Sequence, residues 1–240
     1  MMKESLVKNG TMLGAFAVVT TALIALTFFG TEEKIEQQRK QKLLSVLNEV
    51  VPKRYHDNAL YADCALIEAS ELGEQSTHKV YRARLEGKPS ALILEATAPD
   101  GYSGNIDMVI GVDTSMTVLG VRVVDHKETP GLGDKVELAI SDWIKSFSGR
   151  TFSSDNTKQW QVKKDGGEFD QFTGATITPR AVVGAVKRAL AFTNDNQAQL
   201  FNAPNACAPG DAELAANVID TDVIEPDEQP INNNEGEQDD

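Results

Sequence analysis

An uninterrupted apolar run near the amino terminus constrains this chain most. Residues 11–30, TMLGAFAVVTTALIALTFFG, contain no charged side chain. As an α-helix rising about 1.5 Å per residue, the run spans about 30 Å, the hydrocarbon thickness of a bilayer. A cleaved signal peptide is the weaker alternative, because its apolar region is usually shorter and ends in a small-residue cleavage site. The run therefore predicts an uncleaved single transmembrane helix at residues 11–30.

The charges that flank this helix do not settle its orientation. Lys3 and Lys8 precede it, whereas Glu32 and Glu33 follow it, which favours a cytoplasmic position for residues 1–10. Four basic residues then occur between positions 34 and 42. The positive-inside rule counts basic residues rather than net charge, and long domains translocate despite flanking charges. Charge alone leaves both orientations open.

The acidity of the chain belongs to its carboxyl-terminal tail. The formal net charge is −13, yet residues 211–240 contain 11 acidic and no basic residues, so 25 acidic residues oppose 23 basic ones in the rest. No basic excess is present to bind phosphates, so nucleic acid is not a predicted partner. Residues 209–240 are predicted to be an acidic disordered tail. A docking arm is the alternative, with no motif to support it.

The remaining pattern predicts an α+β domain behind the anchor. Residues 31–52 carry a partial apolar stripe that ends at Pro52, which indicates a stalk helix packing on the domain. The segments 80–85, 90–97, 105–113 and 117–126 have the alternating or continuous apolar character of strands. Short connections between them favour antiparallel hairpins. The predicted fold is a mixed, largely antiparallel sheet with packed helices, within a domain at residues 53–208.

Three further elements are expected after these strands. Residues 134–147 have apolar side chains at helical spacing, and residues 159–165 resemble another strand. Residues 178–193 predict a helix, with Thr178 as its N-cap and Pro179 at the first helical position.

Two short stretches are candidates for chemistry. DQFTGATIT, residues 170–178, has no histidine, cysteine or lysine, but it leads into a helix whose amino terminus suits a phosphate. HKETPGLGDK, residues 126–135, contains glycines that let backbone N–H groups approach a flat polar ligand. Taken singly, each is better explained as an ordinary turn before a helix.

Together the two stretches resemble the FMN-binding domain family. The order is GYSGNIDMVIGVD, HKETPGLGDK, Trp143 and then DQFTGATITPRAVV, and the resemblance covers residues 90–192. Members are covalently flavinylated subunits of membrane electron-transport complexes. Within the family the chain looks most like the G subunits of Rnf electron-transport complexes. The C subunits of the sodium-translocating NADH:quinone oxidoreductase share the motif and are the alternative.

The resemblance implies a specific attachment site. The family motif Asp-x-x-Ser/Thr-Gly-Ala-Thr matches Asp170, Thr173, Gly174, Ala175 and Thr176. It implies that Thr176 Oγ carries FMN through a phosphoester bond, installed from FAD by a flavin transferase that reads the preceding motif residues. The other residues that the resemblance assigns to the flavin are Ile177, Glu128, Thr129, Gly131, Leu132 and Gly133.

The implied function is electron transfer by FMN. No side chain is expected to act as a catalytic residue or a metal ligand. The expected partners are the A, B, C, D and E subunits of an Rnf complex that links NADH and ferredoxin redox chemistry to an ion gradient. The expected location is a bacterial inner membrane, with the domain in the periplasm. A rival from another class is a non-redox anchored sensor or assembly ectodomain, in which DQFTGAT only starts a helix.

The two cysteines, Cys64 and Cys207, are far apart and form no CxxC or Cys/His cluster, so neither zinc nor an iron–sulfur cluster is predicted. An oxidising periplasm would permit a disulfide between them. Two free thiols are an equal alternative.

Overall fold

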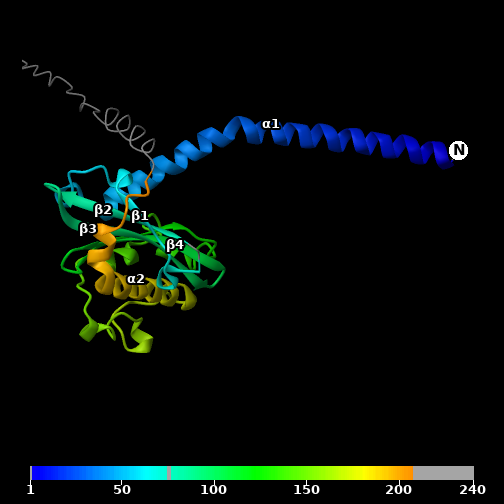
Figure 1. Ribbon diagram of the computed structural model, residues 1–240. Coiled ribbons are helices and arrows are strands. Elements are labelled where there is room, and N and C mark those ends of the chain that lie inside the picture. The colour runs from blue at the N-terminus through cyan, green and yellow to red at the C-terminus, as the bar shows by residue number, and fades with distance from the viewer. Residues whose placement is uncertain (1, 75–76, 208–240) are drawn as a thin grey trace, which may run out of the picture.

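The computed structural model of the chain describes residues 2–74 and 77–207, so the predicted tail at 209–240 lies outside the described residues. The first element is α1, a helix over Met2–Val50 that extends far from the domain (Figure 1). Its segment Val7–Phe28 is long and apolar enough to cross a membrane, and none of it is buried inside the protein. The predicted anchor and the predicted stalk are therefore parts of one continuous helix.

A five-stranded sheet forms the centre of the domain. Its strands are β1 (Cys64–Ile67), β2 (His78–Leu85), β3 (Lys88–Gly101), β4 (Gly104–Asp113) and β5 (Val118–Asp125). They lie in chain order, and each pairs antiparallel with the next. The α+β class and the four predicted strands are confirmed. Strand β1 was missed because its four residues are too few to establish an alternating pattern.

Helices cover both faces of this sheet. The second α-helix, α2 (Ile177–Asn202), lies along one face, and the end of α1 lies on the other (Figure 1). Along β3, Leu92 and Leu94 belong to the hydrophobic cluster with α2, whereas Ile93 belongs to the cluster with α1. This double coverage explains the continuous apolar run at 90–97, because a strand buried on both faces has no solvent side.

Two glycines let α1 approach the sheet closely. Gly111 of β4 pairs with Gly120 of β5, and Val50 of α1 packs over both. A Cβ on Gly111 would lie 2.5 Å from Val50 Cγ1, and one on Gly120 would lie 3.2 Å from Val50 Cα. The first distance is shorter than real Cβ contacts and the second is tighter than most of them, so larger residues at these positions would push the helix away from the sheet. The end of α1 is therefore part of the domain core.

The remaining helical segments are short 3-10 helices. They are η1 (Lys53–Tyr55), η2 (Leu60–Ala62), η3 (Ser70–Leu72), η4 (Asp134–Val136), η5 (Asp142–Phe147), η6 (Ser154–Asn156) and η7 (Lys163–Asp165).

The helix predicted at 134–147 is wrong, because this segment forms η4 and η5 with a non-helical break between them. Glu137 and Ser141 have extended backbones, and the Ser141 hydroxyl accepts a hydrogen bond from Trp143 N at 3.1 Å. A serine that bonds to nearby backbone competes with helix formation. Ile144 and Phe147 still reach the core, but Ile140 remains exposed.

The strand predicted at 159–165 is also wrong. Val162 makes only an isolated bridge to Phe169, and the chain then turns through η7. The apolar residues of this segment instead join an aromatic cluster in which Phe147 stacks on Phe169 with ring centroids 4.4 Å apart. Burial in a compact turn therefore produced an apolar pattern similar to that of a strand.

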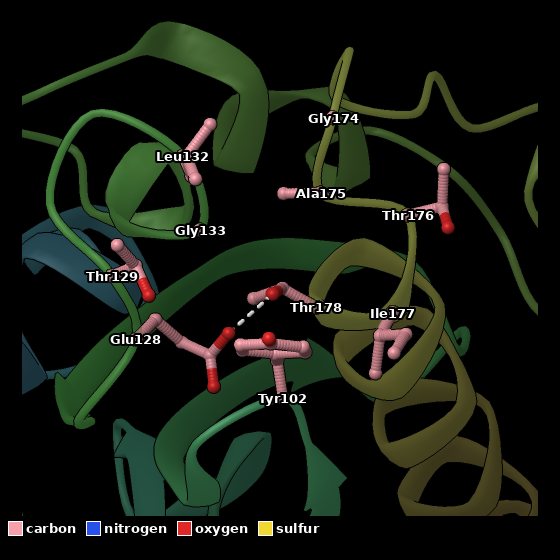
Figure 2. Close-up of a pocket in the computed structure, with 10 residues that line it drawn as sticks. All are labelled: Tyr102, Glu128, Thr129, Leu132, Gly133, Gly174, Ala175, Thr176, Ile177 and Thr178. Atoms are coloured by element: carbon pink, nitrogen blue, oxygen red, sulfur yellow. Dashed lines mark hydrogen bonds between the residues drawn. The ribbon is translucent and has the colours of Figure 1, made fainter.

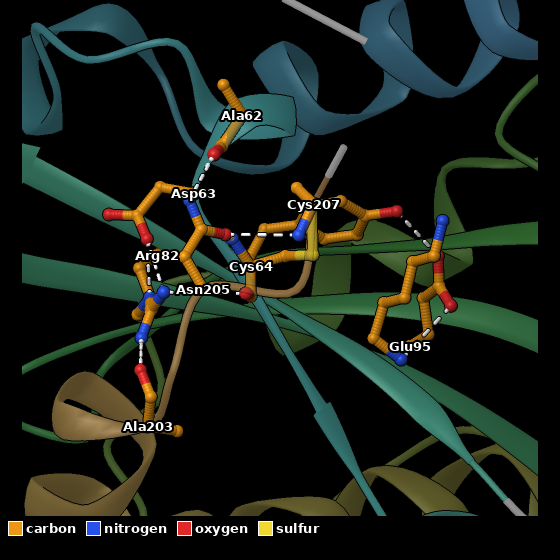
Figure 3. Close-up of a disulfide and its surroundings, with 10 residues drawn as sticks. Ala62, Asp63, Cys64, Arg82, Glu95, Ala203, Asn205 and Cys207 are labelled. Atoms are coloured by element: carbon orange, nitrogen blue, oxygen red, sulfur yellow. Dashed lines mark hydrogen bonds and ion pairs between the residues drawn. A yellow bond between two sulfur atoms is a disulfide. The ribbon is translucent and has the colours of Figure 1, made fainter. Parts of the chain in front are cut away.

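A disulfide joins Cys64 of β1 to Cys207, with Cα atoms 5.4 Å apart (Figure 3). Beside it, the buried Arg82 donates to Asp63 Oδ1 at 2.6 Å and to the carbonyl of Ala203. Asn205 accepts a hydrogen bond from Cys64 N at 3.1 Å. These contacts hold the segment after α2 against the edge of the sheet.

Candidate functional site

A cavity of about 380 Å³ opens where three segments meet at the beginning of α2 (Figure 2). The segments are the β3–β4 hairpin tip, the loop after β5, and the loop before α2 together with the first turn of that helix. The cavity is lined by Tyr102, Glu128, Thr129, Leu132, Gly133, Gly174, Ala175, Thr176, Ile177 and Thr178. Its volume falls within the range of about 300–1,000 Å³ that is usual for small-molecule sites. The two stretches singled out from the sequence thus lie on one pocket.

Glu128 connects all three segments. Its side chain is only 5% exposed, and its Oε1 accepts a hydrogen bond from Ser103 N of the hairpin tip at 2.9 Å. Its Oε2 accepts from the Thr178 hydroxyl in the first turn of α2 (Figure 2). A buried carboxylate must have such partners to be tolerated. Glu128 therefore assembles the pocket by joining hairpin, loop and helix.

The surroundings of Glu128 fix its position. Its backbone N–H donates to His126 Nδ1 at 3.0 Å, and His126 Nε2 lies 2.6 Å from Glu137 Oε1. Gly133 leaves room for the carboxylate, because a Cβ there would lie 2.7 Å from Glu128 Oε2. The absence of that side chain allows the loop to close tightly over Glu128.

Replacing Glu128 with alanine is expected to lower the free energy of unfolding by about 2–4 kcal/mol, because Ser103 N–H and the Thr178 hydroxyl would lose a charged acceptor. Urea denaturation measures this change. Glu128→Gln keeps the shape of the side chain and one acceptor oxygen. Its loss in free energy of unfolding should therefore be at most half that of the alanine variant. Equal stability of the alanine variant and the wild type would contradict the linking role of Glu128.

Aromatic packing supports the loop before α2. Phe172 is buried and meets Trp143 edge to face, with ring centroids 5.1 Å apart. Trp143 Nε1 donates to the carbonyl of Asp170 at 2.9 Å. Gly174 has a φ of 82°, a left-handed conformation that favours glycine. The buried ring of Phe172 thus positions the exposed residues that follow it.

Thr176 is the N-cap of α2, and its side chain makes no capping hydrogen bond. It is exposed at the edge of the cavity. The prediction of Thr178 as N-cap is wrong: the helix begins earlier, at Ile177, and the buried Thr178 hydroxyl donates to Glu128 instead. The first turn of α2 therefore keeps backbone N–H groups free of side-chain capping, beside an exposed hydroxyl.

The structure brings together most, but not all, of the residues predicted to contact the ligand. Those that line the cavity are Glu128, Thr129, Leu132, Gly133, Gly174, Ala175, Thr176 and Ile177. Asp170, Thr173 and Gly131 do not line it. Gly131 forms the loop turn, with its N–H donating to Asp134 at 2.8 Å. Asp170 lies outside the cavity, with Oδ1 2.5 Å from Lys163 Nζ.

Sequence reasoning missed Tyr102 as a lining residue and missed the role of Thr178. A signal for Tyr102 was present in GYSGN, where a large aromatic residue stands between glycines at a hairpin turn. Arg180, in the first turn of α2, forms a bidentate ion pair with Asp165, with N–O distances of 2.6 and 2.9 Å. This hydrogen bonding lowers the pKa of Asp165. Arg180 therefore holds the η7 turn.

Among the described residues, no cluster of His, Cys, Asp and Glu could hold a metal ion. The site instead offers a helix amino terminus, an exposed hydroxyl and a cavity bordered by small and apolar side chains. The family model of the FMN-binding domain matches residues 101–191, which contain every segment of the site. Fold and site thus define an FMN-binding domain carried on a membrane-type helix.

The particular family follows from two further comparisons. The model of the RnfG N-terminal region matches residues 1–50. A protein of Pseudoalteromonas atlantica is 53% identical over 86% of this chain and 96% of its own length. Proteins of Vibrio cholerae and Shewanella baltica are 52% and 50% identical, over 83% and 86% of this chain and 96% and 98% of their own lengths. Each of the three is named as the G subunit of an ion-translocating oxidoreductase complex.

The chain belongs to the family of G subunits of ion-translocating oxidoreductase complexes, the Rnf complexes. This membership favours the Rnf branch over the C subunits of the sodium-translocating quinone reductase. It also sets aside a non-redox ectodomain, because the family consists of oxidoreductase subunits.

Proposed function

We propose that this protein carries FMN covalently on Thr176 Oγ, through a phosphoester bond, and transfers electrons within its complex. The observation that carries the proposal is the position of Thr176. Its side chain is exposed and makes no capping hydrogen bond, and the residue borders the cavity and immediately precedes a 26-residue helix. A phosphate on this oxygen would lie at the helix amino terminus, where backbone N–H groups and the helix dipole favour negative charge.

The residues around the cavity fit a flavin. Gly174 and Ala175 leave space next to the attachment point, and Leu132 and Ile177 present apolar surface. Glu128 keeps the three walls together through Ser103 and Thr178. FMN supplies the redox chemistry when bound, and the chain supplies position, environment and tethering.

We further propose that a flavin transferase recognises the exposed side of the same loop. Asp170, Thr173 and Gly174 are exposed and precede Thr176 by a few residues. In the transfer, Thr176 Oγ attacks the FMN phosphorus of FAD, the diphosphate bond breaks, AMP leaves and the hydroxyl proton is released. The absence of a side chain at Gly174 and the small side chain of Ala175 would allow another enzyme to reach Thr176 Oγ.

The whole complex is proposed to link NADH and ferredoxin redox chemistry to an ion gradient, with the A, B, C, D and E subunits as partners.

Residues 1–10 are proposed to be cytoplasmic and the domain periplasmic in a bacterial inner membrane. The Cys64–Cys207 disulfide supports this orientation, because such bonds persist in oxidising compartments. Protease added to spheroplasts should cleave the domain, whereas cleavage only after membrane disruption would contradict this orientation.

Covalent flavinylation has a direct test. The chain is produced with and without an active flavin transferase, separated on a denaturing gel under ultraviolet light and weighed by mass spectrometry. With the transferase we expect a fluorescent band and a mass gain equal to FMN minus water, because a phosphoester survives denaturation. A dark band of unmodified mass in both preparations would refute the covalent link.

A further inference from the structure

The tip of the β3–β4 hairpin presents an aromatic ring to the cavity. Tyr102 lines the cavity and is 68% exposed, and its ring lies beside the Glu128 carboxylate (Figure 2). Within the described part of the chain, its hydroxyl has no hydrogen bond. A tyrosine can contribute to a fold by burying its ring and by hydrogen bonding through its hydroxyl, and Tyr102 does neither to any large extent among the described residues. The folded domain itself therefore gives no packing reason for an aromatic residue here.

The hairpin tip is held firmly in spite of its exposure. Gly101 pairs with Gly104 across the turn, and Ser103 N donates to Glu128 Oε1 at 2.9 Å. A Cβ on Gly101 would lie 2.2 Å from the Gly104 carbonyl oxygen and 3.0 Å from Glu128 Oε1. The glycine therefore allows the tip to approach the buried carboxylate, which places Tyr102 on a fixed backbone. A residue on a fixed backbone loses little conformational entropy when a ligand binds to it.

Two other exposed apolar side chains border the same cavity. Leu132, from the loop after β5, and Ile177, from the first turn of α2, are each 44% exposed. Together with Tyr102 they place apolar surface from three segments around one opening. Apolar side chains gathered at a concave site mark a surface that a ligand covers. A planar aromatic ligand matches this arrangement, because aromatic rings pack well against one another.

We propose that Tyr102 is a positioning residue against whose ring the isoalloxazine of the flavin packs, with Leu132 and Ile177 bordering it. The proposal rests on FMN as the ligand of the proposed function, but not on the covalent bond to Thr176. It adds a contact from the hairpin tip to a site otherwise built from the two loops. The ring restrains the orientation of the flavin, and the Thr176 linkage restrains its location.

The test uses Tyr102→Ala and Tyr102→Phe in the full-length chain, in two preparations. The first is made with the transferase, and fluorescence is measured per covalently bound flavin before and after denaturation. The second is made without it and titrated with riboflavin, which lacks the phosphate. The second preparation tests the ring contact even if no covalent flavin forms, so failure of the covalent link and failure of the ring contact are distinguishable.

We expect the native wild type to quench flavin fluorescence, because a phenol in contact with excited flavin donates an electron to it. Tyr102→Ala should remove this quenching and weaken riboflavin binding roughly twofold to tenfold, the usual contribution of one aromatic pair. Tyr102→Phe should remove the quenching but keep the affinity, because the ring remains. Tyr55→Phe, a tyrosine beyond the cavity lining, should change neither quantity.

The proposal is overturned if Tyr102→Ala matches the wild type in both quenching and riboflavin affinity, or if Tyr55→Phe relieves the quenching as fully as Tyr102→Phe. Absence of flavin from both wild-type preparations would overturn it together with the proposed function. Thermal unfolding of the variants checks the fold, which should be intact because most of the Tyr102 side chain is exposed.

Discussion

Replacing Thr176 with valine is expected to abolish covalent flavin completely. Valine has nearly the same shape as threonine but lacks the oxygen that forms the phosphoester. Because Thr176 is exposed and its hydroxyl makes no capping hydrogen bond, the substitution should leave α2 and the domain folded. Gel fluorescence and intact mass of protein made beside an active flavin transferase measure the loss.

The matched control is Thr173→Val, which makes the same chemical change three residues earlier. Thr173 is also exposed but does not line the cavity, so this variant should still carry flavin, at a rate that depends on how the transferase reads the motif. Peptide mapping should place the label on Thr176. A flavinylated Thr176→Val protein would show that another hydroxyl is the acceptor.

Loss of the Cys64–Cys207 disulfide is expected to produce the largest change in stability. The bond joins residues separated by 143 positions, and the loop-entropy model assigns about 5 kcal/mol to closing so long a loop. For a domain of this size, that corresponds to a fall in melting temperature on the order of 10–20 °C. Calorimetry of the Cys64→Ala, Cys207→Ala double variant measures it.

Reduction of the wild type provides the control for this prediction. Wild type in dithiothreitol should unfold near the melting temperature of the double variant, and dithiothreitol should not affect the variant. The hydrogen bonds of Asn205 to Cys64 N and to Ala62 do not need the sulfur atoms, so the chain end should remain docked in the folded state. Identical melting temperatures for oxidised and reduced wild type would contradict the expected stabilisation.

Strands and α2 could be predicted because their signals are local. The alternation in 105–113 and the buried run in 90–97 reflect which side chains face the helices on each side of the sheet. The apolar stripe of 178–193 likewise lies against the core, although the helix continues to Asn202. The helix predicted at 134–147 and the strand predicted at 159–165 were wrong, because the apolar residues of these segments are buried without forming a regular helix or strand.

The functional site, like the fold, has some features that local sequence patterns predict and others that depend on contacts between distant residues. The motif 170–176 and the loop 126–135 were identified as stretches, but neither stretch contains the information that they border one cavity. That depends on Glu128, whose partners Ser103 and Thr178 are 25 and 50 residues away. Tyr102 and Thr178 joined the site only through these contacts, whereas Asp170, Thr173 and Gly131 proved to lie outside the cavity.

Local sequence patterns predict the membrane-type helix, the antiparallel strands, the approximate position of α2 and the resemblance to FMN-binding domains, because each depends on neighbouring residues and their spacing. Contacts between distant segments decide the rest: α1 continues from its apolar segment into the domain core, Cys64 meets Cys207, and a hairpin tip and two loops form one pocket. These features arise from contacts between distant segments, which no local pattern specifies. The proposal of Thr176 as the attachment residue rests on both kinds of information. The sequence motif identifies the residue, and the structure shows that it is exposed at the start of α2 without a capping hydrogen bond.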